Sequence, residues 1–95
     1  MKVIVKRVGK SPEIEEIKDE LKTYQKIVGG NIEVFPFVDD ILCVCNDEGK
    51  LINLPVNFFF FNDYICGDVI FISEKGEDFI GLSDKQIEII KEMFE

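Results

Sequence analysis

The side chains that could perform chemistry in this chain are mainly carboxylates. The sequence contains no His, so proton transfer would fall to Asp, Glu, Lys, Tyr or Cys. Adjacent carboxylates occur at Asp39-Asp40, Asp47-Glu48 and Glu77-Asp78. All three pairs lie in segments rich in turn-forming residues, where carboxylates are usually solvated. The sequence therefore predicts a protein that is not an enzyme.

The cysteines give no sign of a nucleophile or a metal site. A reactive thiolate needs a nearby cation or helix start, yet Cys43 and Cys45 lie in an apolar segment and Cys66 precedes Gly67-Asp68. One residue separates Cys43 from Cys45, whereas zinc-binding cysteine pairs are separated by two to four. An odd number of cysteines also argues against a disulfide framework. We expect free thiols, no metal and no cofactor.

Several amide and aromatic side chains cluster around predicted turns and could hold a small ligand. Amides donate and accept hydrogen bonds at the edge of a nucleobase, and an aromatic ring stacks on its face. The structural alternative is that these Asn residues simply form turns. The candidate ligand-binding residues are Asn46, Lys50, Asn57, Asn62 and Phe59.

The net charge of −8 is unevenly distributed. Residues 1–30 carry seven basic and five acidic side chains, whereas residues 31–95 carry four basic and 14 acidic ones. This balance disfavours duplex DNA and anionic membranes as partners. It fits either simple solubility or an acidic face that docks on a basic partner. The candidate residues for such a protein interface are Asp39, Asp40, Asp47, Glu48 and Asp63.

A length of 95 residues predicts one domain spanning residues 1–95. The longest uncharged run, residues 51–62, is too short to cross a membrane. The apolar run near Met1 is too short for the core of a signal peptide. We therefore expect a cytoplasmic protein.

The first elements are predicted to be a strand and a helix. Residues 3–8 are rich in Val and Ile, which favours a strand. Ser11 could cap a helix with Pro12 at its first position, and apolar residues then recur at helical spacing as far as Val28. Gly29 is expected to end this helix in a left-handed conformation.

Strands are predicted at residues 31–38 and 41–45. Pro36 indicates an edge or a bulge in the first, and the apolar run of the second indicates a central strand. The segment from Asn46 to Gly49 predicts a type I turn with Gly in the left-handed position, and residues 50–54 are predicted to return as a strand.

The remaining sequence predicts a further strand and a closing helix. In the run Phe58 to Phe61, alternate rings should point away from the core unless something covers them. A strand is expected at residues 65–73, with Gly67 as a bulge. Ser83 with Gln86 forms a capping box ahead of the C-terminal helix. The predicted fold is α+β, in the order β-α-β-β-β-β-α: a mostly antiparallel sheet of about five strands with a helix in the N-terminal half and a C-terminal helix.

Several short segments, taken in order, resemble one known family. They are Ile27 to Val34, Asn46 to Leu51, Leu54 to Asn57, Gly67 to Val69, and Gly76 to Phe79 ahead of Leu82-Ser83-Asp84. Their order and spacing are similar to the domain-of-unknown-function 3846 family, small proteins of phages and mobile elements of Gram-positive bacteria. The resemblance covers most of the chain from about residue 25, and it implies a setting rather than a mechanism.

Three functional hypotheses follow from this setting. The favoured one is a non-enzymatic counter-defence protein that sequesters a nucleotide immune signal in a pocket formed by hairpin turns, or across a homodimer interface. The second is an acidic inhibitor that imitates nucleic acid and blocks a host nuclease or a restriction or CRISPR effector. The third is a structural or regulatory module with no role in defence.

Overall fold

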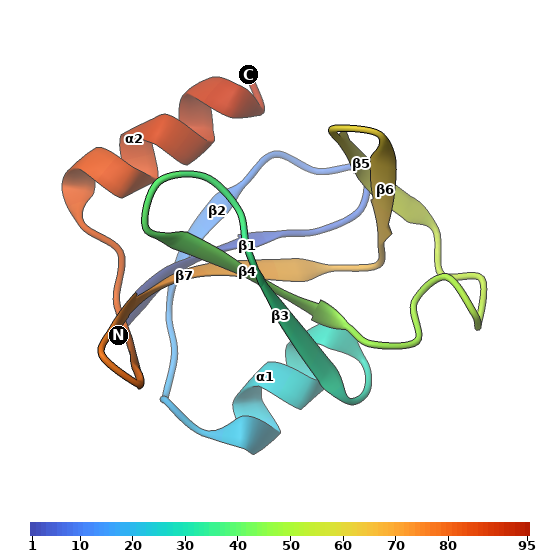
Figure 1. Ribbon diagram of the computed structural model, residues 1–95, viewed down its shortest axis with the longest axis horizontal. Helices are drawn as coiled ribbons and strands as arrows, with labels where there is room; N and C mark the ends of the chain where they lie inside the picture. Colours follow the sequence, from blue (N-terminus) through green and yellow to red (C-terminus); the bar gives the residue numbers. More distant parts are fainter.

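A computed structural model describes residues 1–95 as an α+β protein with two helices (Figure 1). The strands are β1 (Lys2–Lys6), β2 (Glu13–Glu16), β3 (Ile32–Pro36), β4 (Ile41–Asn46), β5 (Val56–Phe60), β6 (Asp63–Cys66), β7 (Val69–Lys75) and β8 (Asp78–Ile80), and the helices are α1 (Leu21–Val28) and α2 (Asp84–Met93). The predicted α+β class and the mostly antiparallel sheet are confirmed.

The main sheet has the strand order β2-β1-β7-β4-β3, and β8 pairs with the last three residues of β7, Ser73 to Lys75. All of its pairings are antiparallel. β7 lies between β1 and β4, and its residues Val69 to Ser73 are all buried. β4 is likewise central, as its apolar sequence predicts, and β3 with Pro36 is an edge strand. β5 and β6 form a separate hairpin, called here the β5–β6 hairpin.

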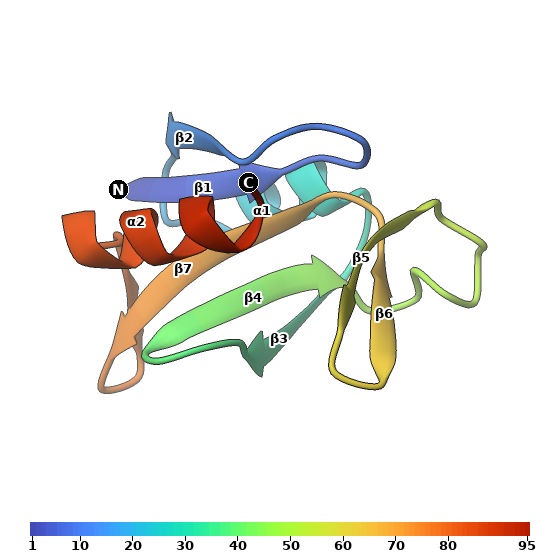
Figure 2. The ribbon, with the colours of Figure 1, turned by 90° about the horizontal axis from the view of Figure 1, so that it is seen from above.

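The two faces of the sheet are covered by different elements. Figure 1 shows α1 below the sheet, and α2 and the β5–β6 hairpin above it. Along β7, Ile70 and Ile72 pack with Tyr24 and Val28 of α1. Val69 and Phe71 face the opposite way and pack with residues of α2. Seen from above, the hairpin and α2 lie toward opposite ends of the sheet, and the hairpin is next to the end of β4 and the start of β3 (Figure 2).

The predicted helix over residues 11–28 is wrong in its first half. Glu13 to Glu16 form the edge strand β2, and α1 begins only at Leu21. The neighbouring β1 is buried, so its amides need hydrogen-bonding partners that water cannot supply. Pairing with β2 supplies them, and this long-range requirement overrides local helix propensity. The C-terminal cap is confirmed, since Gly29 has φ 83.

The predicted hairpin return over residues 50–54 is also wrong. β4 is already paired with β3 on one edge and β7 on the other, so no edge remains for another strand. The chain instead makes consecutive turns, and the positive φ in this segment belongs to Asn53 rather than to Gly49. The predicted strand at 65–73 is divided into β6 and β7 at Gly67, which has φ 82.

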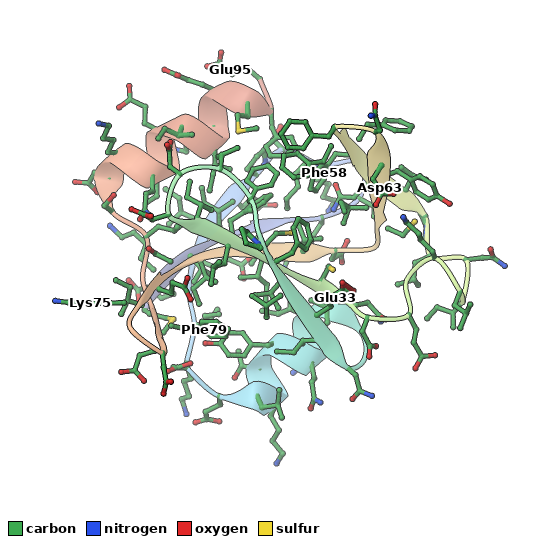
Figure 3. All side chains as sticks on the ribbon, in the orientation of Figure 1. Glu33, Phe58, Asp63, Lys75, Phe79 and Glu95 are labelled. Atoms are coloured by element: carbon green, nitrogen blue, oxygen red, sulfur yellow. The ribbon has the colours of Figure 1, made fainter.

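The Phe run alternates as predicted. Phe58 and Phe60 pack on the core, with ring centroids 5.9 and 4.6 Å from that of Phe37. Phe59 and Phe61 are 79% and 88% exposed. Figure 3 shows Phe58 between the hairpin and the C-terminal end of α2. The capping box of α2 is confirmed, because Ser83 and Gln86 each accept a backbone hydrogen bond from the other residue.

Candidate binding pocket

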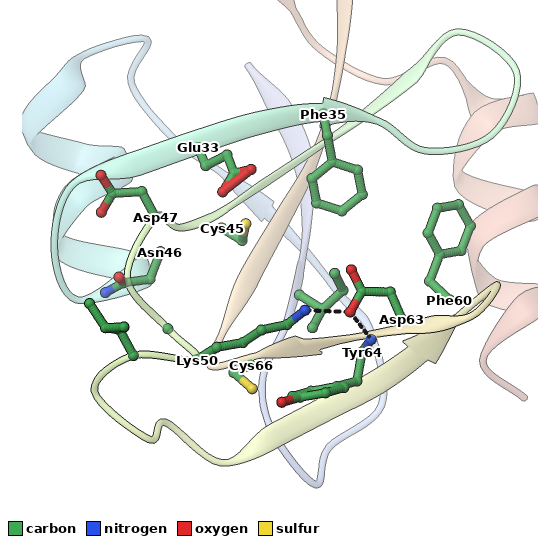
Figure 4. Close-up of a pocket in the computed structure, with 13 residues that line it drawn as sticks. Glu33, Phe35, Cys45, Asn46, Asp47, Lys50, Phe60, Asp63, Tyr64 and Cys66 are labelled. Atoms are coloured by element: carbon green, nitrogen blue, oxygen red, sulfur yellow. Dashed lines mark hydrogen bonds and ion pairs between the residues drawn. The ribbon is translucent and has the colours of Figure 1, made fainter.

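A pocket of about 440 Å³ lies between the main sheet and the β5–β6 hairpin (Figure 4). β3 contributes Glu33 and Phe35, and the turns after β4 contribute Asp47 and Lys50. The hairpin contributes the opposite wall with Phe60, Asp63, Tyr64 and Ile65, and the buried thiols of Cys45 and Cys66 also line the pocket. Its volume lies within the range of small-ligand sites.

Lys50 is held on the hairpin wall by two neighbours. Its Nζ forms an ion pair with Asp63 Oδ1 and lies 4.4 Å from the centroid of the Tyr64 ring. The same carboxylate oxygen accepts a hydrogen bond of 2.7 Å from the backbone N–H of Tyr64. The hydrogen bond from Lys50 lowers the pKa of Asp63, and the same bond raises the pKa of Lys50. The ammonium charge is therefore already compensated within the chain.

Two further carboxylates on the pocket wall, those of Glu33 and Asp47, form no ion pair. Glu33 pairs with Cys45 across β3 and β4, so both side chains lie on the same face of the sheet. Burial, together with the charges of Glu33 and Asp47, raises the pKa of Cys45 to about 11. The thiol is thus neutral at physiological pH, and the pocket carries excess negative charge.

Asn46 lies at the pocket, but its amide is occupied by structural contacts. Its Nδ2 donates to the carbonyl of Val28, and its Oδ1 accepts from the backbone N–H of Glu48. The residue therefore joins the end of β4 to α1 and shapes the following turn. Of the predicted ligand-binding residues, Asn46 and Lys50 line this pocket.

Asn57 lies away from the pocket and anchors the hairpin. Its Oδ1 accepts from Lys6 Nζ at 2.9 Å, and its Nδ2 donates to the carbonyls of Lys6 and Gly67 at 2.8 Å each. Asn62 is exposed in the turn between β5 and β6, and Phe59 is exposed next to Tyr64, 6.5 Å between centroids. The predicted ligand-binding set is therefore not gathered in one place.

The predicted acidic interface is also divided. Asp47 and Asp63 line the pocket, with Glu48 beside Asp47. Asp39 and Asp40 precede β4 and line a second cavity, of about 560 Å³, with basic neighbours Lys75 and Lys85. The six residues of β4 separate the two groups by roughly 20 Å. Figure 3 places Lys75 and Asp63 at opposite ends of the molecule.

Exposed apolar side chains are concentrated in the β5–β6 hairpin and the turns that precede it. Of the 11 large apolar residues that are exposed, six lie between residues 51 and 64. They are Leu51, Ile52, Val56, Phe59, Phe61 and Tyr64, called here the hairpin surface. Such a concentration of exposed apolar side chains is typical of an interaction site.

Sequence reasoning missed Glu33, Phe35 and Tyr64 as pocket residues. The alternation of β3 already placed Glu33 and Phe35 on one face, which was the available signal. No local signal indicated that β5 and β6 would pair as a hairpin, or that this hairpin would pack over that face.

The protein is thus a small α+β protein with a helix on each face of an antiparallel sheet. The β5–β6 hairpin lies on the same side of the sheet as α2. The chain belongs to the family described as Domain of unknown function (DUF3846), whose model matches residues 1–95. No curated protein and no solved structure matches the chain. Neither helix is long and apolar enough to cross a membrane.

Proposed function

We propose that this protein acts without catalysis, by stoichiometric binding of a partner protein that has a basic and partly apolar surface. The observation that carries this proposal is the combination of the hairpin surface with the unpaired carboxylates of Glu33, Asp47 and Glu48 at one end of the molecule. Lys50 is the one basic side chain that lines the pocket, and it is paired with Asp63.

Apolar contact and charge would have separate roles in such a complex. Removing exposed Phe and Leu side chains from water favours association, at about 25 cal/mol for each Å² of apolar surface buried. The surrounding carboxylates attract a basic partner and repel an acidic one. Partner choice would therefore depend on charge, and complex lifetime on the apolar side chains.

The partner class that fits this surface best is an enzyme with a basic nucleic-acid channel. Such channels expose Lys and Arg to bind phosphates, and an acidic protein can occupy them in place of nucleic acid. Together with the phage and mobile-element setting that the family resemblance implies, this supports the role of a cytoplasmic counter-defence inhibitor of a nuclease or a restriction or CRISPR effector.

The pocket is less well suited to a nucleotide signal. Phosphate groups would meet the unpaired carboxylates of Glu33 and Asp47, and the charge of Lys50 is already compensated by Asp63. Nucleotide sequestration stays a prediction with a direct test. A nucleotide that binds only the folded state raises its thermal stability, so a panel of cyclic and ADP-ribose-type nucleotides should produce no shift if our proposal is right.

The proposal is tested with a panel of purified nucleases and restriction and CRISPR effectors, by measuring complex formation and inhibition at two salt concentrations. We expect a complex with at least one of them that weakens as salt rises. Phe59→Ala/Phe61→Ala should weaken that complex by about tenfold or more. Ile14→Ala/Leu21→Ala, which removes exposed apolar side chains elsewhere, is the matched control and should have little effect. A nucleotide-induced thermal shift with no protein complex would contradict the proposal.

A further inference from the structure

We infer that the pocket receives an arginine side chain of the partner, with its guanidinium paired to Glu33 and stacked against aromatic rings on the pocket wall. This inference rests on the proposed function and names the group that the pocket recognises. Three features of the pocket support it: the aromatic rings on its walls, the charge of those walls, and the contacts that hold Lys50.

Aromatic rings from both walls line the pocket. Phe35 of β3 and Phe60 of the hairpin contact each other, with ring centroids 6.2 Å apart, and Tyr64 lies further along the hairpin wall. Figure 4 shows the side chains of Glu33 and Phe35 directed from β3 toward the hairpin. A planar group in the pocket can stack on the open face of one ring and contact a carboxylate at the same time.

The charge of the walls selects a cation. Glu33 and Asp47 have no ion-pairing partner within the chain. The thiol of Cys45 beside Glu33 stays protonated, because burial and both carboxylates raise its pKa to about 11. Both side chains are exposed to water, so their charge attracts a cation and repels an anion.

Lys50 shows that this pocket already holds a cation by the same two features. Its ammonium is paired with the carboxylate of Asp63 and lies over the Tyr64 ring. This contact is independent of Glu33, which lies on the opposite wall (Figure 4). On the hairpin wall the chain therefore holds a cation of its own, Lys50. On the opposite wall the carboxylate of Glu33 pairs with no cation of the chain.

Arginine fits this second wall better than lysine. A guanidinium is planar, stacks on aromatic faces and can donate two parallel hydrogen bonds to one carboxylate, whereas an ammonium is a compact and strongly hydrated charge. The combination of Glu33 with the rings of Phe35 and Phe60 supplies both contacts that the guanidinium favours.

The test uses the full chain labelled with ¹⁵N and three small probes: the N-acetyl amides of arginine, lysine and citrulline. Citrulline keeps the shape of arginine without its charge. We expect arginine to shift the amide signals of Glu33, Cys45 and Tyr64, with a Kd at least about fivefold below that of lysine. Citrulline should cause no comparable shift.

Three variants, one of them a control, locate the binding group. Glu33→Gln should weaken arginine binding by about tenfold, whereas Glu92→Gln, the same charge change at an exposed position on α2, should leave it unchanged. Lys50→Met should strengthen arginine binding, because it removes a like charge and frees Asp63. The same change would weaken a phosphate ligand.

The outcomes separate this inference from the proposed function. Equal binding of arginine and lysine, or equal effects of Glu33→Gln and Glu92→Gln, would overturn the arginine inference. A complex found in the enzyme panel would then still support the proposed function. Arginine binding with the expected variant effects supports the inference even where the enzyme panel yields no complex.

Discussion

Asn57 has a structural role, because its amide ties the β5–β6 hairpin to β1. It accepts a hydrogen bond from Lys6 Nζ and donates to two backbone carbonyls at the base of the β5–β6 hairpin. Burial lowers the pKa of Lys6, so its ammonium depends on such partners. In the sequence alone, Asn57 cannot be distinguished from an Asn that forms a turn. Its contact with Lys6, 51 residues away in the chain, exists only in the folded protein.

Replacing Asn57 should therefore affect stability more than binding. We expect Asn57→Ala to lower the free energy of unfolding by about 1 to 3 kcal/mol, because buried polar groups lose their partners. Urea denaturation measures this change. Asn62→Ala, in the exposed turn, is the matched control and should stay within about 0.5 kcal/mol of the wild type. Equal stabilities of the two variants would disprove the anchoring role.

The buried thiols make stability sensitive to alkaline pH. The pKa of Cys45 is raised from 9.0 to about 11, and burial raises that of Cys43 as well. An unfolded thiol loses its proton near pH 9, while the folded one keeps it until about pH 11. The stabilisation is therefore complete below pH 9 and is lost as pH rises toward 11.

This dependence can be measured as the urea midpoint at pH 8, 9, 10 and 11. We expect the wild-type midpoint to fall across this range and the midpoint of Cys45→Ala to fall less steeply. The variant removes the Cys45 proton and leaves Cys43 in place. Parallel curves for the two proteins would show that Cys45 does not contribute.

At the scale of elements, local signals predicted some boundaries and failed at others. The capping box at Ser83 and the left-handed cap at Gly29 depend on residues within one turn, and both are confirmed. The helix predicted from Ser11 failed because residues 13–16 pair with β1. The strand predicted at residues 50–54 failed because both edges of β4 were already occupied.

Side chains along β5 point alternately to the core and to solvent, so adjacent Phe residues should contribute differently to stability and to binding. Phe58 packs on Phe37, Phe71 and Phe94, whereas Phe59 is exposed. We expect Phe58→Ala to cost about 2 to 3 kcal/mol of unfolding free energy, and Phe59→Ala less than about 0.5 kcal/mol.

The same pair can be compared in partner binding. Phe59→Ala should weaken the complex while the protein keeps wild-type stability, because the hairpin surface loses an exposed ring. Differential scanning calorimetry and a binding isotherm give the two quantities for each variant. If Phe59→Ala unfolded as readily as Phe58→Ala, β5 would not have the alternation described above.

At the scale of the whole molecule, the net charge of −8 should give salt two opposite effects. Screening reduces repulsion among the carboxylates of the folded chain and so favours folding. It also weakens attraction to a basic partner. We expect a rise from about 20 to about 300 mM NaCl to increase the urea midpoint and to decrease partner affinity. A complex insensitive to salt would exclude electrostatic recognition.

The fold class was predictable because it depends on the periodicity of apolar residues, which the sequence displays directly. The pocket was not, because it depends on how the hairpin packs over β3. Charge composition indicated an acidic protein, but not that Asp39 and Asp40 lie a strand length away from Asp47 and Asp63. Those separations are properties of the assembled sheet.

The position of β7 between β1 and β4 has a consequence for how the chain folds during synthesis. β1 with β2, and β3 with β4, are pairs of neighbouring segments that can form early. They join into one sheet only through Val69–Lys75, which is made late. Contacts between distant segments form slowly, so we expect the nascent chain to remain without its core until most of it has left the ribosome.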